Sequence, residues 1–297
     1  MPQANPGTLF LGLDAGGTRC RARLEAADGT VLGNGLAGPA NLTLGVAIAY
    51  RSIAAAIAQA YAAAGLGRAA RRRTHAAFGV AGIEDAARAA ALAAKPRGCA
   101  SLGLHSDAVT ACVGAHGGGD GGILILGTGS QGLVRRGRSR RRVGGWGFPI
   151  SDHGSAAMVG QQALRHALLA QDGVGEATGL TRRIMRRFDG DPRRALVWAR
   201  QATPAQWGEL APLVFGAARR GDAAAAALVA EAVADVVRLL DRMQALGARR
   251  IALVGGMAAA YAPLLPRRLK RVVVPAERDA LAGALLLARQ AASGGPR

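Results

Sequence analysis

The sequence predicts an α/β protein of two similar lobes with a cleft between them, and three observations support this fold class. Strand-like and helix-like segments alternate along the chain. An apolar strand, a glycine-rich turn and a second strand follow one another twice, at 9–24 (LFLGLDAGGTRCRARL) and at 123–137 (ILILGTGSQGLVRRG). A length of 297 residues, half of them hydrophobic, suffices for two domains that each bury a core.

The first half begins with three strands and then alternates between helices and strands. Short apolar or alternating runs predict the strands, and isoleucines at near-helical spacing or alanine-rich sequence predict the helices. The expected elements are strands over 8–13, 20–26 and 30–36, a helix over 45–64, a strand over 74–80, a helix over 85–94 and a short strand before residue 107. Asp107 then opens a helix, where its carboxylate is expected to be the N-cap.

The second half repeats the order of strand, glycine turn, strand and strand. Its expected elements are a strand over 121–126, strand-like sequence over 133–142, mostly helices over 154–247, strands over 251–254 and 271–274, and a last helix over 278–290. The glycine-rich run AHGGGDGG separates the halves. We therefore expect an N-terminal lobe over 1–116 and a C-terminal lobe over 117–297, with the last helix able to pack back on the first lobe.

Composition restricts the function classes. The net charge is +19, and all but two of the 38 basic residues are arginine. The arginine clusters at 71–73, 135–142 and 182–187 contain no aromatic residues and match no nucleic-acid-binding module, so we read them as solvated faces and expect no specific nucleic-acid partner. Three widely spaced cysteines favour a reducing cytoplasm. We find no signal peptide and expect no run long enough to cross a membrane.

Two common motifs do not apply. Gly127, Gly129 and Gly132 match the dinucleotide fingerprint, but that motif requires a helix after the turn, and the sequence over 133–142 is strand-like. Neither lysine follows a glycine, which excludes a Walker A loop.

The spacing of Cys99, His105, Cys112 and His116 fits no zinc pattern, and Cys112 is expected to point inward as a small hydrophobic residue.

The chain resembles the BadF/BadG/BcrA/BcrD ATPase family of the sugar kinase, Hsp70 and actin superfamily. The resemblance extends from about Leu11 to Leu287 and is closest to bacterial glucosamine and N-acetylglucosamine kinases. It is carried by the order and spacing of GLDAGGTRCRARL, GPANLTLG, FGVAGIED, SDAVTACVGAH, ILGTGS, GGWGFPISDHGSA, ALVGGM and ERDALAGALLLA. It implies two ribonuclease H-like lobes that hold a nucleotide and a sugar in the cleft.

The resemblance also implies an activity and a set of site residues. The activity is ATP- and Mg²⁺-dependent phosphorylation of the 6-hydroxyl of an amino sugar, glucosamine first, by a cytoplasmic homodimer. Asp107 would be the catalytic base, and Asp14 would hold Mg²⁺ through water. ATP would contact Gly16, Gly17 and Thr18, then Gly127, Thr128, Gly129 and Ser130, and its adenosine would contact Gly255 and Gly256. The sugar would contact Asn41, Asp107, Gly145, Trp146, Gly147 and Asp152.

The chemistry of these residue types agrees with such roles but leaves simpler ones open. Glycine lets the backbone approach a phosphate, and threonine adds a hydroxyl donor. However, Asp107 can simply cap a helix, Asp14 can stabilise a turn and Trp146 can simply pack. The other functions that we weigh are N-acetylglucosamine kinase, ATPase activator of an iron–sulfur dehydratase or reductase, sugar-sensing regulator and nucleic-acid-binding protein.

Overall fold

The computed structural model of the protein describes residues 7–95 and 98–294, and the chain divides into two compact units. The first unit contains residues 1–120 and 275–297, and the second contains residues 121–274. The chain thus leaves the first unit after Asp120 and returns to it at Pro275. The last helix therefore belongs to the same unit as the first strand.

A five-stranded sheet forms the centre of the first unit, in the order β3-β2-β1-β4-β5. Its strands are β1 (Leu9–Ala15), β2 (Cys20–Ala26), β3 (Val31–Ala37), β4 (Thr74–Val80) and β5 (Ser101–His105). β1, β2 and β3 are antiparallel neighbours, and β4 and β5 continue the sheet parallel to β1. β1 is almost entirely buried, as expected of a central strand covered on both faces.

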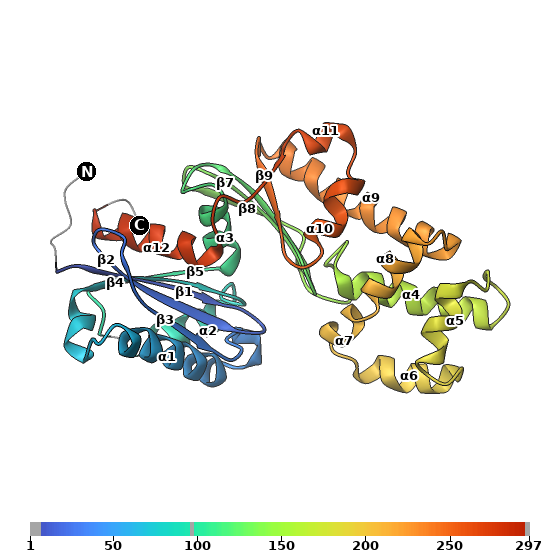
Figure 1. The fold of residues 1–297 in the computed structure, drawn as a ribbon, viewed down its shortest axis with the longest axis horizontal. Coiled ribbons are helices and arrows are strands. Elements are labelled where there is room, and N and C mark those ends of the chain that lie inside the picture. Colours follow the sequence, from blue (N-terminus) through green and yellow to red (C-terminus); the bar gives the residue numbers. More distant parts are fainter. Residues whose placement is uncertain (1–6, 96–97, 295–297) are drawn as a thin grey trace. The chain divides into compact units, whose positions relative to one another are not determined.

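Helices cover both faces of this sheet (Figure 1). They are α1 (Val46–Ala63), α2 (Ala86–Ala93), α3 (Asp107–Ala115) and α12 (Ala280–Ala292), with the short helices η1 (Leu42–Leu44) and η2 (Arg68–Arg73). Alternate residues of β1 face opposite sides: Leu11 and Leu13 join the core under α1, whereas Phe10 joins Leu285 of α12. The first strand is therefore covered on one face by the last helix of the chain.

Helix α1 is long and apolar enough to cross a membrane by length and composition, with 18 residues and a mean hydropathy of 1.2. This corrects our expectation that no such run exists. In the structure α1 packs on β2 and β3 and buries Ile53, Ile57 and Tyr61 in the core of the first unit. A helix that packs in a core meets the same criterion as a membrane span, so this helix alone is weak evidence for a membrane.

The second unit repeats the sheet of the first, in the order β10-β9-β6-β7-β8. Its strands are β6 (Gly121–Leu126), β7 (Ser130–Arg136), β8 (Ser139–Val143), β9 (Ile251–Val254) and β10 (Val273–Val274). β6, β7 and β8 are antiparallel neighbours, and β9 and β10 run parallel to β6. Strand order and direction are thus the same in both units, which confirms the predicted fold class of two similar α/β lobes.

In the described part of the chain most helices belong to the second unit, and six of these lie between β8 and β9 in sequence (Figure 1). They are α4 (Ala156–Gln171), α5 (Gly179–Arg186), α6 (Pro192–Gln201), α7 (Pro204–Gly208), α8 (Ala211–Arg219) and α9 (Ala223–Ala245), followed after β9 by α10 (Ala258–Tyr261), η3 (Ala262–Leu264) and α11 (Arg267–Lys270). The long α9 packs against β7 and β8. β7 directly follows the second glycine turn, so the rejection of the dinucleotide motif is confirmed.

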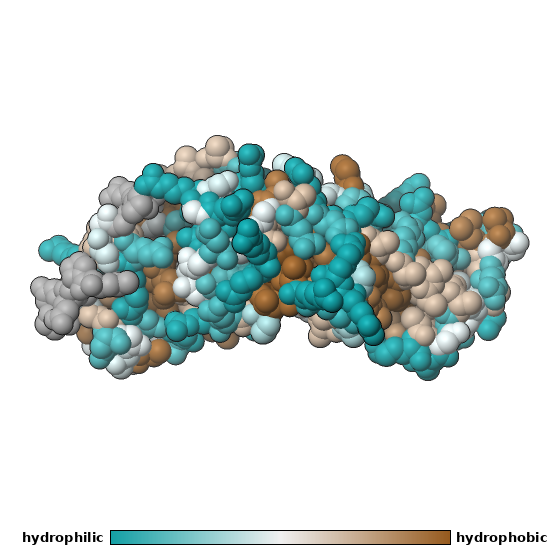
Figure 2. Space-filling view, turned by 90° about the horizontal axis from the view of Figure 1, so that it is seen from above, coloured by the Kyte–Doolittle hydropathy of each residue, from teal (hydrophilic) through white to brown (hydrophobic). Residues whose placement is uncertain are grey.

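Hydrophilic residues cover most of the surface that Figure 2 shows, with apolar residues scattered among them. Several exposed arginines form ion pairs, including Arg187 with Glu209 and Arg268 with Asp241. Such exposed pairs contribute little to stability. They agree with the interpretation of the arginine clusters as solvated faces.

Candidate functional site

The first glycine turn is the four-residue connection between β1 and β2. Ala15 and Cys20 are the last pair of the ladder, and the Gly16 N–H donates to the Arg19 carbonyl at 3.0 Å. A Cβ added at Gly17 would meet no atom within 4 Å, and one at Gly16 would lie 3.6 Å from the Arg19 carbonyl. Neither glycine is explained by packing within the protein. Both fit a surface that a ligand approaches closely.

Asp14 is the next-to-last residue of β1 and is separated from this turn by Ala15. Its Oδ2 accepts from Nε and Nη2 of Arg21, at 3.2 and 2.8 Å, and Arg21 is the cross-strand partner of Asp14 on β2. The third nitrogen of this guanidinium, Nη1, donates to Oδ2 of Asp279 at 2.9 Å. Asp14 is therefore an ion-paired side chain and not only a turn residue.

Asp107 is the first residue of α3, but it is not the N-cap that we expected. The N-cap is Ser106, whose hydroxyl accepts from the Val109 N–H at 3.3 Å. Serine and aspartate are both good N-caps, so the residue type alone does not decide which of the two caps the helix. With Ser106 as the cap, the Asp107 carboxylate accepts from the nearby Ala108 N–H at 2.9 Å.

The surroundings of Asp107 stabilise its protonated form. The pKa of this carboxyl is raised to about 6: burial is the largest cause, the negative charges of Glu84 and Asp14 add to the rise, and the Ala108 hydrogen bond opposes it. A carboxylate with a pKa close to neutral pH is suited to accept a proton. Burial and like charge together mark Asp107 as a functional candidate.

The acidic groups around the end of β1 fit a hydrated Mg²⁺ better than a dedicated metal cage. Across the described ranges 7–95 and 98–294, no group of three or more His, Cys, Asp or Glu side chains is arranged to hold a metal ion. Mg²⁺ keeps several waters and binds through one or two carboxylates together with substrate phosphates. Asp14 is partly exposed beside the first glycine turn, so its carboxylate would be accessible to such a hydrated ion.

Asn41 lies beside the first glycine turn because the Ala40 N–H donates to the Gly16 carbonyl at 2.9 Å. The side-chain oxygen of Asn41 accepts from the Thr43 N–H at 2.9 Å and so caps η1. A Cβ added at Gly82 would lie 2.7 Å from this oxygen, so the loop after β4 packs closely against it. The first unit thus brings Asn41 and the first glycine turn together.

The second glycine turn connects β6 and β7 and is held by the start of α4. The Gly127 N–H donates to the Gly129 carbonyl at 2.9 Å, and Gly127 and Thr128 carbonyls accept from Ala156 and Ala157. Thr128 is exposed, so its hydroxyl is available to a ligand. Ser130 is buried and its hydroxyl donates to the His153 carbonyl at 2.7 Å, which fixes the turn from within.

The loop between β8 and α4 holds the remaining candidate residues for the sugar. Trp146 has 76% of its surface exposed, so ordinary packing does not explain it. The Arg142 guanidinium lies 4.4 Å from its ring centroid, a cation–π contact that steadies the indole. Gly145 and Gly147 have φ of +72° and +104°, which favours glycine at both positions.

Asp152, in contrast to Trp146, is buried and closely held. Its φ of +66° is in the left-handed region, which is uncommon for a residue with a Cβ. Its Oδ1 accepts from the Gly147 N–H at 3.2 Å, and a Cβ added at Gly129 would lie 2.7 Å from its Oδ2. Burial raises the pKa of Asp152, while that hydrogen bond and the charge of Arg142 lower it. Asp152 thus lies directly against the second glycine turn.

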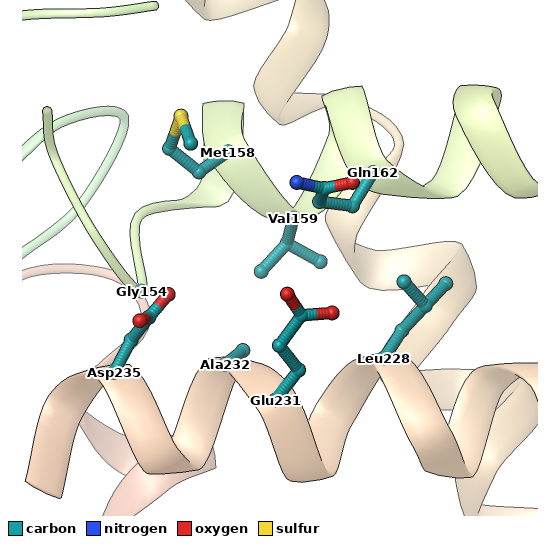
Figure 3. A pocket seen from close by; sticks show the side chains of 8 residues that line it. All are labelled: Gly154, Met158, Val159, Gln162, Leu228, Glu231, Ala232 and Asp235. Atoms are coloured by element: carbon teal, nitrogen blue, oxygen red, sulfur yellow. The ribbon is translucent and has the colours of Figure 1, made fainter. Parts of the chain in front are cut away.

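The residues after Asp152 are fixed by α9 and α10. The Tyr261 hydroxyl donates to the Gly154 carbonyl at 2.7 Å, and the His153 ring lies 3.9 Å from Asp235 of α9. A small recess, open to solvent, lies between α4 and α9 beside Gly154 (Figure 3). Glu231 and Asp235 point toward it from α9, and Asp235 is paired with Arg238.

The turn after β9 contains Gly255 and Gly256, and the two positions differ in whether the fold itself requires a glycine. Gly255 has a φ of +99°, and a Cβ there would lie 2.3 Å from the Leu126 carbonyl, so the fold itself requires glycine. A Cβ at Gly256 would meet no atom within 4 Å. Gly256 therefore has the same property as Gly17: no neighbouring protein atom explains the glycine.

The predicted residues form two groups, one in each unit. The first unit brings together Asp14, the first glycine turn, Asn41 and Asp107; the second brings together the second glycine turn, the loop from Gly145 to Asp152, and Gly255 with Gly256. Two partners were missed. Arg21 could have been found from its place opposite Asp14 across a four-residue turn, whereas the sequence gives no signal that Tyr261 binds Gly154.

Comparison with known proteins agrees with these features. Residues 11–288 match the BadF/BadG/BcrA/BcrD ATPase family. The chain is 37% identical to the glucosamine kinase GspK of Vibrio cholerae over 279 residues, which is 94% of this chain and 95% of that protein. It is also 37% identical to the N-acetyl-D-glucosamine kinase of Dictyostelium discoideum over 126 residues, which is 40% of this chain and 39% of that protein.

A crystal structure from Chromobacterium violaceum, assigned as an N-acetylglucosamine kinase, superposes with a TM-score of 0.87 at 35% identity and covers 95% of this chain and 100% of its own. The family match and the relatives matched over nearly their whole length lead to one conclusion. This chain belongs to the BadF/BadG/BcrA/BcrD ATPase family.

Proposed function

We propose that this protein is an ATP-dependent amino-sugar kinase that transfers the γ-phosphate of ATP to the 6-hydroxyl of glucosamine. The observation that carries the proposal is the similarity of this chain to a glucosamine kinase over 94% of its length. The geometry supports it, since two glycine turns suited to phosphate accompany a carboxylate whose pKa is raised to about 6.

Asp107 is the proposed catalytic base. In the reaction the sugar oxygen forms a bond to the γ-phosphorus, the bond between that phosphorus and the β–γ bridging oxygen breaks, and ADP leaves with the electron pair. The hydroxyl proton passes to the Asp107 carboxylate. With a pKa of about 6, most Asp107 side chains are ionised at pH 7 and above and can accept this proton.

The other proposed contacts follow the chemistry of each group. Gly16, Gly17, Thr18, Gly127, Thr128 and Gly129 would contact the phosphates, and Gly255 and Gly256 the adenosine. Ser130 would act on the phosphate only by holding its turn, because its hydroxyl is already donated to His153. Mg²⁺ would neutralise charge on the phosphate oxygens when bound, with Asp14 holding it through water.

Asn41, Asp152 and the loop from Gly145 to Gly147 would bind the sugar. Asp152 is the best placed of these to read a sugar hydroxyl, because its carboxylate is buried and fixed in orientation. The exposed indole of Trp146 offers an apolar face to a sugar ring. The N-acetyl sugar is the second candidate substrate, since two of the relatives are described as N-acetylglucosamine kinases.

The activator of an iron–sulfur enzyme is less well supported. Such a protein needs thiolates that can reach a cluster, but Cys20 and Cys112 are both buried. Burial, together with the charge of Asp14, raises the pKa of the Cys20 thiol to about 12, which keeps it protonated.

The free cysteines support a cytoplasmic location for the protein. The family resemblance supports a homodimer, and light scattering would test this oligomeric state.

A panel assay tests the proposal. ADP release is measured with glucosamine, N-acetylglucosamine, glucose and mannosamine, and the phosphorylated carbon is identified by phosphorus–proton NMR. We expect the highest kcat/KM with glucosamine and phosphate on O6. ADP release that no sugar stimulates would contradict the kinase proposal, and preference for the acetylated sugar would favour the second candidate.

A further inference from the structure

Arg21 joins two carboxylates that are far apart in sequence and near the phosphate turn. On β2 it lies directly opposite Asp14, and two of its nitrogens donate to the same oxygen of Asp14, Oδ2. Its remaining terminal nitrogen, Nη1, donates to Oδ2 of Asp279 at 2.9 Å. Within the residues that the structure describes, no hydrogen bond is recorded to Oδ1 of Asp14. The pair therefore leaves one defined oxygen for a ligand.

Asp279 is itself fixed, so it can anchor the guanidinium. It is the N-cap of α12, and its Oδ1 accepts from the Ala282 N–H at 3.0 Å. Helix α12 packs directly on β1: a Cβ at Gly12 would lie 2.7 Å from Leu285 Cγ and 2.9 Å from the Leu281 carbonyl. Both ends of the Arg21 bridge thus belong to one tightly packed part of the first unit.

The same helix also approaches the element that holds Asp107. A Cβ at Gly283 of α12 would lie 1.9 Å from the Thr110 carbonyl of α3, and one at Gly114 of α3 would lie 2.1 Å from the Asp279 carbonyl. Because α3 and α12 are in backbone contact, the position of Asp279 is tied to the helix that begins at Asp107. Arg21 therefore connects Asp14 to the scaffold of the proposed base.

An aspartate at the end of a strand can rotate about χ2, and 21% of the Asp14 side chain is exposed. A carboxylate that orients the water shell of Mg²⁺ must keep one orientation, since Mg²⁺ demands near-octahedral geometry. The planar guanidinium fixes that orientation through two hydrogen bonds, which a lysine ammonium cannot reproduce. Groups that orient metal ligands in this way typically change metal affinity 10–100-fold when they are replaced.

We infer that Arg21 is a positioning residue that holds Oδ2 of Asp14 against β2, turns Oδ1 to the metal–phosphate shell, and is itself anchored by Asp279. This inference rests on the proposed function, because it assumes that Asp14 acts on Mg²⁺-bound phosphate. It assigns to the C-terminal helix a role in ordering the phosphate site.

The test compares R21Q, R21K and D279N with a matched control, R23Q. Arg23 lies two residues further on the same face of β2, and its Nε donates to Asn34 instead of Asp14. Three measurements are made on each protein: the melting curve, the affinity for ADP by calorimetry in Mg²⁺ and in EDTA, and turnover with glucosamine as a function of Mg²⁺ concentration.

For R21Q we expect about a tenfold or greater rise in the Mg²⁺ concentration that gives half-maximal turnover, with the KM for glucosamine nearly unchanged. The gain in ADP affinity that Mg²⁺ provides should be lost, while ADP binding in EDTA is kept. R21K should recover little of either property, D279N should show a smaller change in the same direction, and R23Q should match the wild-type protein.

A folded R21Q with wild-type Mg²⁺ dependence and wild-type ADP binding would overturn the inference. Full recovery in R21K would overturn the role of the planar fork, since charge alone would then suffice. If R21Q does not fold, R21K and D279N test the inference in its place. R21K keeps the positive charge at position 21, and D279N keeps a side chain that can cap α12. The proposed function can fail separately. If the wild-type protein phosphorylates no amino sugar but its Mg²⁺-dependent ADP binding still requires Arg21, the inference about Arg21 holds and the proposed substrate is wrong.

Discussion

Replacing Asp107 with asparagine should make the protein more stable and almost inactive. In the folded state burial raises the pKa of this carboxyl from 3.8 to about 6. Between these values the unfolded chain ionises while folded Asp107 stays protonated, so the folded state loses stability as pH rises. Above pH 6 the full cost applies, and about two pKa units correspond to ~3 kcal/mol.

Asparagine has no charge to bury, so D107N should remove up to about 3 kcal/mol of this cost at pH 8. Its side-chain oxygen can still accept the Ala108 N–H, and Ser106 still caps α3. At about pH 3 and below, where Asp107 is mostly protonated in both states, the two proteins should unfold at nearly the same denaturant concentration. Denaturant unfolding at about pH 3 and at pH 8 measures both values.

Turnover should change in the opposite direction. Without a base, kcat should fall on the order of 10²–10⁴-fold, while ATP binding is kept. In the wild-type protein kcat/KM should fall as pH drops through about 6, because Asp107 becomes protonated. D85N is the matched control, since Asp85 caps α2 through the Arg88 N–H and asparagine can also cap a helix. A folded D107N with near-normal turnover, or one that is less stable than wild type at pH 8, would refute this reasoning.

Three further changes test the other parts of the site. T128V should weaken ATP binding by about 1.5–3 kcal/mol through loss of a hydroxyl donor to phosphate, with sugar affinity retained; equal loss of both ligands would make Thr128 structural. G255A should lower the melting temperature, because its φ is +99° and its Cβ would lie 2.3 Å from the Leu126 carbonyl, whereas G256A should melt normally and weaken ATP binding; a normally melting G255A would contradict the structure of this turn. W146A should leave the melting curve unchanged, since the side chain is 76% exposed, and raise the KM for the sugar; an unchanged KM would remove Trp146 from the site.

The regular elements of both sheets were predictable because their patterns are local. Strands β2, β4, β6 and β9 have the bounds that the sequence predicted, since each is a short apolar or alternating run between turn residues. β10 is shorter than predicted, Val273–Val274 instead of 271–274. An apolar pattern indicates that a strand exists but not how many residues pair with its neighbour.

The positions of the two glycine turns between strands and of Asp107 at the start of α3 were also predictable from the sequence, but their local partners were not. Whether Ser106 or Asp107 caps α3 depends on which oxygen reaches the backbone N–H groups, and both residue types suit the position. The left-handed backbone of Asp152 depends on the contacts that surround it, among them Gly147 and Gly129. The apolar sequence of α1 does not distinguish a core helix from a membrane span, because both bury the same side chains.

The return of the chain to the first unit at Pro275 has a consequence for protein synthesis. On the ribosome β1 to β5 emerge early, but the helix that covers Phe10 and Ala77 on one face of their sheet is among the last segments to be made. The second unit, which is continuous in sequence, needs no later residues to close its core. A nascent chain released before α12 lacks both this cover and Asp279, so premature termination leaves an open sheet for proteases and not a partly working enzyme.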